Sequence, residues 1–163
     1  MKTAKLEFNY EVYNSSKELN TADAALLNAA RKATKNSFAR YSNFNVGAAA
    51  KLKDEKEIMI GSNQENASYP VSICAERGLM AAVAGKFGKK VIETMAISYV
   101  NKNKGKKSSE PISPCGMCRQ ALVQYEENTK HPIRLILSGK SGKVYVIAEA
   151  KHLLPLQFDG TKL

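Results

Sequence analysis

The chain of 163 residues has no tryptophan, three cysteines, five prolines and ten glycines. So few prolines and glycines, with 44% hydrophobic residues, exclude a collagen-like or largely disordered chain. Its apolar runs, such as residues 79–85, fall far short of the roughly 18 residues of a membrane span. Residues 1–10 lack the apolar block of a secretory signal, and an odd number of cysteines disfavours a disulfide framework. We therefore expect a soluble, cytoplasmic protein with no membrane partner, whose cysteines serve metal binding or catalysis.

Arginine is also scarce, because five arginines stand beside 20 lysines in a chain of net charge +10. Proteins that read nucleic acids usually concentrate their charge and rely on arginine, whereas spaced lysines mostly keep a surface solvated. The one dense group of lysines lies in residues 101–110, around Gly105, and indicates an exposed loop. The charge therefore gives little support for a nucleic-acid partner.

The spacing of apolar residues predicts helices on both faces of one sheet. Residues 6–13 alternate apolar and polar side chains, so residues 1–20 are expected to form an extension with an edge strand or arm, ahead of a single domain at 21–163. Thr21 is the expected cap of the first helix. Helices are expected at 21–35, 73–84 and 115–126, and strands at 46–52, 57–60, 91–100, 133–137 and 144–148. This order predicts an α/β three-layer α/β/α sandwich with a mixed central sheet of about five strands.

Three cysteines stand where two helices are expected to begin. Cys115 and Cys118 form a C-x-x-C pair, so they share one helix face, and the helix amino terminus favours their thiolates. Cys74 opens another predicted helix, which allows three thiolates to meet over one ion. Three protein ligands leave the fourth tetrahedral position of zinc open for water, as a catalytic site requires. Zinc lowers the pKa of such a water to about 7. One catalytic zinc ion per chain is therefore predicted.

Glu76 follows Cys74 by two residues, too close to be a comfortable co-ligand but near enough to reach a bound water or substrate. That is the place of a proton shuttle. The pattern C-x-E at 74–76 followed by P-C-x-x-C at 114–118 resembles the signature of zinc deaminases. Because three thiolates around a dication leave a net negative charge, a nearby cation is useful, and Arg77 is the candidate.

Three further segments narrow the resemblance. Residues 40–49, RYSNFNVGAA, are similar to the YSxFxVGAA segment of nucleoside cytidine deaminases, and residues 61–69, GSNQENASY, are similar to their GxNxENASY segment. The tail LLPLQF at 153–158 extends the likeness, which runs from about residue 21 to the end. The sequence thus resembles the short, zinc-dependent, homotetrameric class of cytidine deaminases.

The resemblance implies pyrimidine salvage: free cytidine and deoxycytidine become uridine and deoxyuridine with release of ammonia. Zinc-bound hydroxide would attack C4 of the base, with Glu76 as the general acid and base. The implied zinc ligands are Cys74, Cys115 and Cys118. The implied substrate contacts are Asn63 and Glu65 with the ribose 3′-hydroxyl, Phe44 with the pyrimidine ring, the Ala75 N–H with the base O2, Ala67 and Tyr69 near the ribose 5′ end, and Phe158 from a neighbouring subunit of a homotetramer with shared active sites.

Other interpretations stay open at this point. One alternative treats the cysteines as small buried hydrophobes, and another as ligands of a structural zinc completed by His131 or His152. Phe44 is also compatible with an ordinary core position, and Phe158 with a simple interface anchor. A polynucleotide cytosine deaminase has only the net charge in its favour, since a strand channel typically needs stacking aromatics and arginines. A non-enzymatic zinc or nucleic-acid-binding module, and a deaminase of a cytosine nucleoside antibiotic, are the remaining alternatives.

Three features depart from the family pattern. Gly78 stands where threonine is frequent, the first 20 residues precede the usual start, and the loop at 101–110 is long for its place before the P-C-x-x-C helix. None of them changes a predicted catalytic position. They bear on substrate range and subunit contacts.

Overall fold

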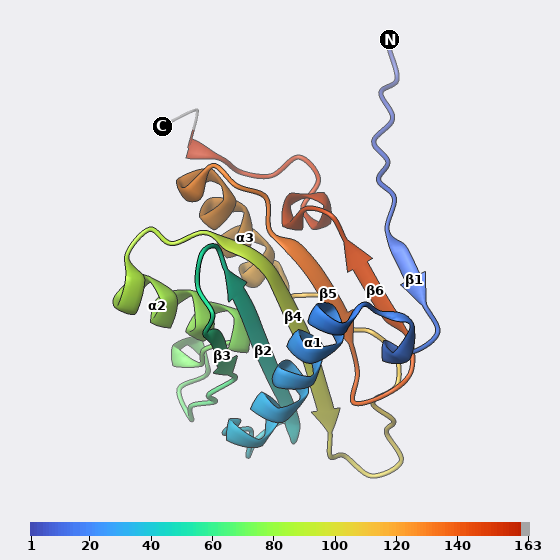
Figure 1. Ribbon diagram of the computed structural model, residues 1–163, viewed down its shortest axis with the longest axis vertical. Coiled ribbons are helices and arrows are strands. Elements are labelled where there is room, and N and C mark those ends of the chain that lie inside the picture. The colour runs from blue at the N-terminus through green and yellow to red at the C-terminus, as the bar shows by residue number, and fades with distance from the viewer. Residues whose placement is uncertain (161–163) are drawn as a thin grey trace.

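The computed structural model describes residues 1–160 (Figure 1). At its centre is a six-stranded sheet in the order β1-β6-β5-β4-β2-β3. The strands are β1 (Glu11–Tyr13), β2 (Phe44–Leu52), β3 (Ile58–Ser62), β4 (Ile92–Asn101), β5 (Arg134–Ser138) and β6 (Val144–Ile147). Strands β4 and β5 run parallel, and the other neighbouring strands are antiparallel. The expected mixed sheet is confirmed, and the N-terminal extension adds β1 as its sixth strand.

Helices cover both faces of this sheet, which confirms the three-layer α/β/α class (Figure 1). Helix α1 (Thr21–Ala33) packs on one face, whereas α2 (Ala75–Phe87) and α3 (Gly116–Thr129) pack on the other. Short 3-10 turns are η1 (Ser16–Glu18), η2 (Thr34–Asn36), η3 (Tyr69–Val71) and η4 (Ala150–Leu153). Within residues 1–160, no helix combines the length and the apolar character that crossing a membrane requires.

Strand β2 is buried on both faces of the sheet, which explains why its sequence is almost continuously apolar. Side chains alternate between the two faces of a strand, so Ala49 packs under α1 while Ala48 and Ala50 pack under α2 and α3. All three alanines are fully buried. The neighbouring strand position must be glycine: a Cβ on Gly47 would lie 2.2 Å from the Ala30 carbonyl oxygen of α1. Small residues therefore let the helices lie directly on the strand.

A second close contact of this kind, at Gly61, fixes the start of α2 on the opposite face of the sheet. A Cβ on Gly61, in β3, would lie 2.4 Å from the carbonyl oxygen of Ala75, the first residue of α2. Only glycine fits such an approach of two backbones. Because Cys74 and Glu76 flank Ala75, this contact determines where both side chains lie against the sheet.

Most predicted boundaries are shifted by one to three residues in the structure, and two differences near the N-terminus have a clear physical reason. Asn20, rather than Thr21, caps α1, because its side-chain oxygen accepts a hydrogen bond from the Asp23 N–H at 2.9 Å. Strand β1 covers only residues 11–13 of the alternating segment 6–13. Its antiparallel register pairs Glu11 with Val146, so β6, which ends at Ile147, offers little ladder to residues further upstream. In Figure 1 those residues extend away from the sheet.

Glu126 is a buried carboxyl group that joins three parts of the fold. It lies near the end of α3 and accepts hydrogen bonds from the N–H groups of Ile133 at 2.7 Å, Ala150 at 2.9 Å and Lys151 at 3.1 Å. Burial raises the pKa of Glu126, while these three backbone donors act in the opposite direction. The carboxyl group thus ties α3 to the chain that enters β5 and to η4.

Glu126→Ala is expected to lower the free energy of unfolding by roughly 3 kcal/mol, because it leaves three backbone N–H donors without an acceptor, two of them on buried residues. Urea unfolding followed by circular dichroism measures the change. Glu127→Ala, one position along the same helix, is the matched control and should stay within about 0.5 kcal/mol of the parent. Equal stability of the two variants would show that Glu126 is not a structural tie.

Candidate active site

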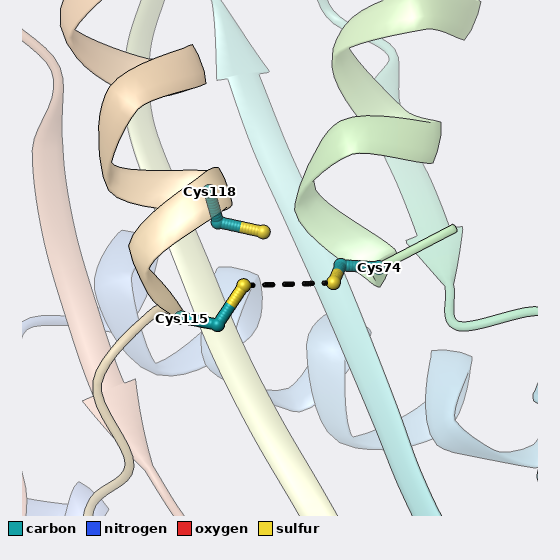
Figure 2. Close-up of side chains that lie close together, drawn as sticks. All are labelled: Cys74, Cys115 and Cys118. Atoms are coloured by element: carbon teal, nitrogen blue, oxygen red, sulfur yellow. Dashed lines mark hydrogen bonds between the residues drawn. The ribbon is translucent and has the colours of Figure 1, made fainter. Parts of the chain in front are cut away.

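The three cysteines converge where α2 and α3 begin (Figure 2). Cys74 is the N-cap residue of α2, Cys115 is the N-cap residue of α3, and Cys118 lies in the first turn of α3. Their sulfur atoms all lie within 4.8 Å of one another, and the Sγ atoms of Cys74 and Cys115 are 3.7 Å apart. In Figure 2 all three side chains point into the space between the two helix starts.

This donor set fits a zinc ion. A tetrahedral ion with Zn–S bonds of about 2.3 Å requires sulfur atoms roughly 3.8 Å apart, close to the measured separation of Cys74 and Cys115. Among residues 1–160, no histidine nitrogen or carboxylate oxygen joins the cluster. The three thiolates would hold the ion and leave one coordination position open.

The two non-catalytic interpretations of the cysteines, as core residues or as ligands of a structural zinc, do not match the geometry. Cys118 is fully buried, but Cys115 is exposed and Cys74 is intermediate, so the three are not simply core residues. His152 stacks on Phe8 with ring centroids 5.5 Å apart. His131 turns its Nδ1 atom to the Pro132 carbonyl oxygen at 2.7 Å. Neither histidine completes a structural zinc site.

The electrostatics of the cluster favour thiolate formation at Cys74. Hydrogen bonds from the Cys118 and Cys115 thiols, together with the positive charge of Arg77, lower the pKa of Cys74 to about 6. Its place at a helix amino terminus acts in the same direction. The bond to Cys74 and its own burial raise the pKa of Cys118. Cys74 can therefore bind a cation as a thiolate near neutral pH.

Glu76 lies in the first turn of α2, 4% exposed, beside these sulfurs. Burial raises the pKa of its carboxyl group, and the negative charge of Cys74 acts in the same direction. A carboxyl group whose pKa is shifted towards neutrality can accept and return a proton near physiological pH. The position and the environment of Glu76 therefore suit a proton shuttle.

A cavity of about 460 Å³ opens beside the cluster. That volume lies in the range of small-molecule sites. Four of its lining residues were expected from the sequence: Asn63, Glu65, Tyr69 and Cys74. The lining residues without a predicted role include Tyr41, Ser42, Ser72, Ile73 and Met117. Tyr41 and Ser42 belong to the YSxFxVGAA segment, so the motif carried a signal, but it gave no role to either residue.

Asn63 and Glu65 both bind the backbone of residues 41–46, which we call the substrate segment. The side chain of Asn63 accepts from the Val46 N–H at 2.8 Å and donates to the Phe44 carbonyl oxygen at 3.0 Å. Glu65 accepts from the N–H groups of Tyr41 at 2.8 Å and Ser42 at 3.2 Å. It also accepts from the Ser42 hydroxyl. Both side chains therefore build the wall of the cavity that they line.

The hydrogen bonds to Glu65 also set its charge. Slight burial acts to raise the pKa of Glu65, but the bonds from Ser42 and Tyr41 outweigh it and lower that pKa. The group is consequently a carboxylate at neutral pH. A carboxylate has about four lone-pair sites, so it can accept a further hydrogen bond from a ligand hydroxyl.

The other predicted contacts are not among the residues that line this cavity. Phe44 is half-buried and stacks on Tyr99, with ring centroids 4.9 Å apart. Ala75 is buried at the start of α2, and Ala67 is exposed in the segment before η3. Phe158 is 65% exposed, and its carbonyl oxygen accepts from Gln120 at 2.9 Å. Within one chain, Phe158 is thus not part of the cavity.

Comparison with known proteins decides the family. The model of the cytidine and deoxycytidylate deaminase zinc-binding region matches residues 20–131, more than half of the chain. The chain belongs to this deaminase family. The cytidine deaminase of Mycoplasma pneumoniae is 35% identical over 109 residues, covering 67% of this chain and 75% of that protein. That of Sporosarcina psychrophila is 34% identical over 135 residues, covering 82% and 89%.

Solved structures agree with the deaminase fold. The crystal structure of cytidine deaminase from Burkholderia pseudomallei superimposes with a TM-score of 0.69 at 34% identity, and the match covers 86% of this chain and all of that one. The resemblance drawn from the motifs and the assignment to the zinc-dependent cytidine deaminases are therefore confirmed. The family's description as a zinc-binding region also agrees with the cluster of three sulfurs.

Proposed function

We propose that this deaminase hydrolyses free cytidine and deoxycytidine to uridine and deoxyuridine with release of ammonia, as a cytoplasmic enzyme of pyrimidine salvage. The arrangement of three features around one point carries the proposal. Three sulfur ligands leave a coordination position open, the buried Glu76 lies beside them, and a cavity ends at one ligand, Cys74. A structural metal site needs neither the carboxyl group nor the cavity.

Each residue of the cluster has a part in this chemistry. Cys74, Cys115 and Cys118 would hold one zinc ion per chain, with Arg77 offsetting the negative charge of the thiolates. When bound, zinc supplies a Lewis acid that activates water for attack on C4 of the base. Glu76 delivers a proton to N3 and then carries one to the leaving amine. Water and cytidine thereby become uridine and ammonia.

The remaining predicted contacts recognise the rest of the nucleoside. The Ala75 N–H, at the start of α2, donates to the base O2, and Phe44 packs on the pyrimidine ring. Asn63 and Glu65 close on the ribose 3′-hydroxyl, where the Glu65 carboxylate has acceptor capacity left after its bonds to the substrate segment. Ala67 and Tyr69 lie near the ribose 5′ end.

Free cytidine is expected to be turned over, whereas cytidine 3′-monophosphate and a cytidine-containing oligonucleotide are expected to be refused. A 3′-phosphate cannot donate to Glu65 and brings a negative charge against its carboxylate, so both changes weaken binding. The measurement is uridine formation at physiological salt from each substrate. Lysines can attract RNA through phosphate contacts without any deamination, so binding alone is not the readout. Comparable rates on the oligonucleotide and on cytidine would favour a polynucleotide deaminase instead.

The enzyme is further proposed to be a homotetramer in which Phe158 reaches the base in a neighbouring subunit's site. Large apolar side chains are exposed beside the cavity and on the C-terminal tail: Tyr69, Val71, Ile73, Met117, Leu156 and Phe158. Exposed apolar patches of this kind mark protein interfaces. Light scattering at assay concentration is expected to give the mass of four chains, and a fully active monomer would refute shared sites.

A further inference from the structure

The lysine-rich loop at residues 101–110 is fixed to the body of the protein at its base. The Asn101 N–H donates to the Ser108 hydroxyl at 2.8 Å, which closes the loop. Two glycines of the β5–β6 turn lie against its far side. A Cβ on Gly139 would lie 2.2 Å from the Ser108 carbonyl oxygen, and one on Gly142 would lie 2.1 Å from that of Ser109. The loop is therefore a built structural element rather than a free basic segment.

This loop reaches the substrate segment through two consecutive carbonyl groups. The side-chain amide of Asn103 donates to the Ser42 carbonyl oxygen at 2.8 Å, and the Lys102 N–H donates to that of Asn43 at 2.9 Å. Asn43 has a φ of 56°, a left-handed conformation that asparagine tolerates better than most residues. In Figure 1 the loop leaves β4 at the end of the sheet where β2 begins, as the pairing of Phe44 with Asn101 requires.

Glu65 holds the opposite side of the same turn. It accepts from the N–H groups of Tyr41 and Ser42 and from the Ser42 hydroxyl, and that hydroxyl accepts in turn from the Phe44 N–H at 3.1 Å. The N–H, hydroxyl and carbonyl groups of Ser42 are thus all engaged, the first two with Glu65 and the last with Asn103. Whatever fixes the Ser42 carbonyl also fixes the donors that orient the Glu65 carboxylate.

We propose that Asn103 is a positioning residue for recognition of the ribose 3′-hydroxyl, acting through Ser42 on Glu65. The proposal rests on the proposed function, in which Glu65 accepts a hydrogen bond from that hydroxyl. Asn103 is not among the residues that line the cavity. It keeps Ser42 in the orientation that points the free lone pairs of Glu65 into the cavity. The long loop is in this way a specificity element of the nucleoside site, and its lysines are incidental to catalysis.

Asn103→Asp tests this directly, because it preserves the size of the side chain and replaces the donor with an acceptor that repels the Ser42 carbonyl. We expect KM for cytidine to rise roughly threefold to tenfold, as the loss of one hydrogen bond predicts, with kcat within about twofold of the parent. KM for 3′-deoxycytidine, which lacks the hydroxyl, should not change. Lys104→Ala, in the same loop, is the matched control and should leave both values unchanged.

A double-mutant cycle separates this path from a general loosening of the site. Glu65→Gln should show the same selective loss, and Asn103→Asp should add little to it, because both changes act on one interaction. An equal rise of KM for both nucleosides, fully additive effects or no change in KM would each overturn the proposal.

Hydrogen exchange gives a readout that does not depend on turnover. Amide protons of Tyr41 and Ser42 should exchange faster in Asn103→Asp than in the parent, and the Lys104→Ala control should match the parent. Unchanged exchange would overturn the role of Asn103. If the zinc-loaded parent deaminates neither nucleoside, the proposed function is wrong. The hydrogen-exchange measurement then still shows whether Asn103 holds the substrate segment.

Discussion

Glu76→Gln is expected to lower kcat for cytidine by at least about 10³-fold, because an amide cannot carry the protons that the reaction moves. Positioned acid and base groups typically contribute 10² to 10⁴ in rate, and one residue serves several transfers here. Glutamine has nearly the same volume, so the packing around this buried position is preserved. The readout is uridine formed per zinc-loaded chain.

The control for Glu76→Gln is the state of the protein itself. Zinc content and thermal unfolding should match the parent, which separates lost chemistry from lost structure. Glu57→Gln, an exposed carboxylate of the same type, should retain full activity. If Glu76→Gln kept more than about a tenth of the parent rate, Glu76 would have a binding role and not carry the protons of the reaction.

Cys115→Ala is expected to remove both the metal and the activity. Two remaining thiolates bind zinc far more weakly than three, and metal binding contributes to folding free energy, so stability should fall as well. Elemental analysis should give close to one zinc per parent chain and almost none in the variant. Glu127→Ala, on the same helix, should keep zinc and activity. Active protein that carries no metal would contradict the assignment of the three cysteines.

Much of the fold is encoded locally and was therefore predictable. The run of small apolar residues along 46–52 follows from burial on both faces, and the helices follow from apolar spacing. The errors fall where two residues compete or where a distant element decides. Asn20 and Thr21 can both cap a helix, and only the bond to Asp23 selects the first. The length of β1 depends on β6, more than a hundred residues away.

In the candidate site, too, locally encoded features could be predicted from the sequence, and contacts between distant segments could not. The cysteines were predictable, because a helix places i and i+3 on one face and helix starts favour thiolates. The bonds among Ser42, Glu65 and Asn103 join three separate loops, so no spacing in the sequence reveals them. The stacking of Phe44 on Tyr99 likewise depends on the register of β2 against β4.

The central claim is most directly tested by incubating purified, zinc-analysed protein with free cytidine and measuring uridine and ammonia together. The account predicts equal amounts of both products, loss of the reaction when a chelator removes the metal, and recovery when zinc is returned. Zinc-loaded protein that forms no uridine from cytidine or deoxycytidine, or a rate that survives complete removal of the metal, would contradict it.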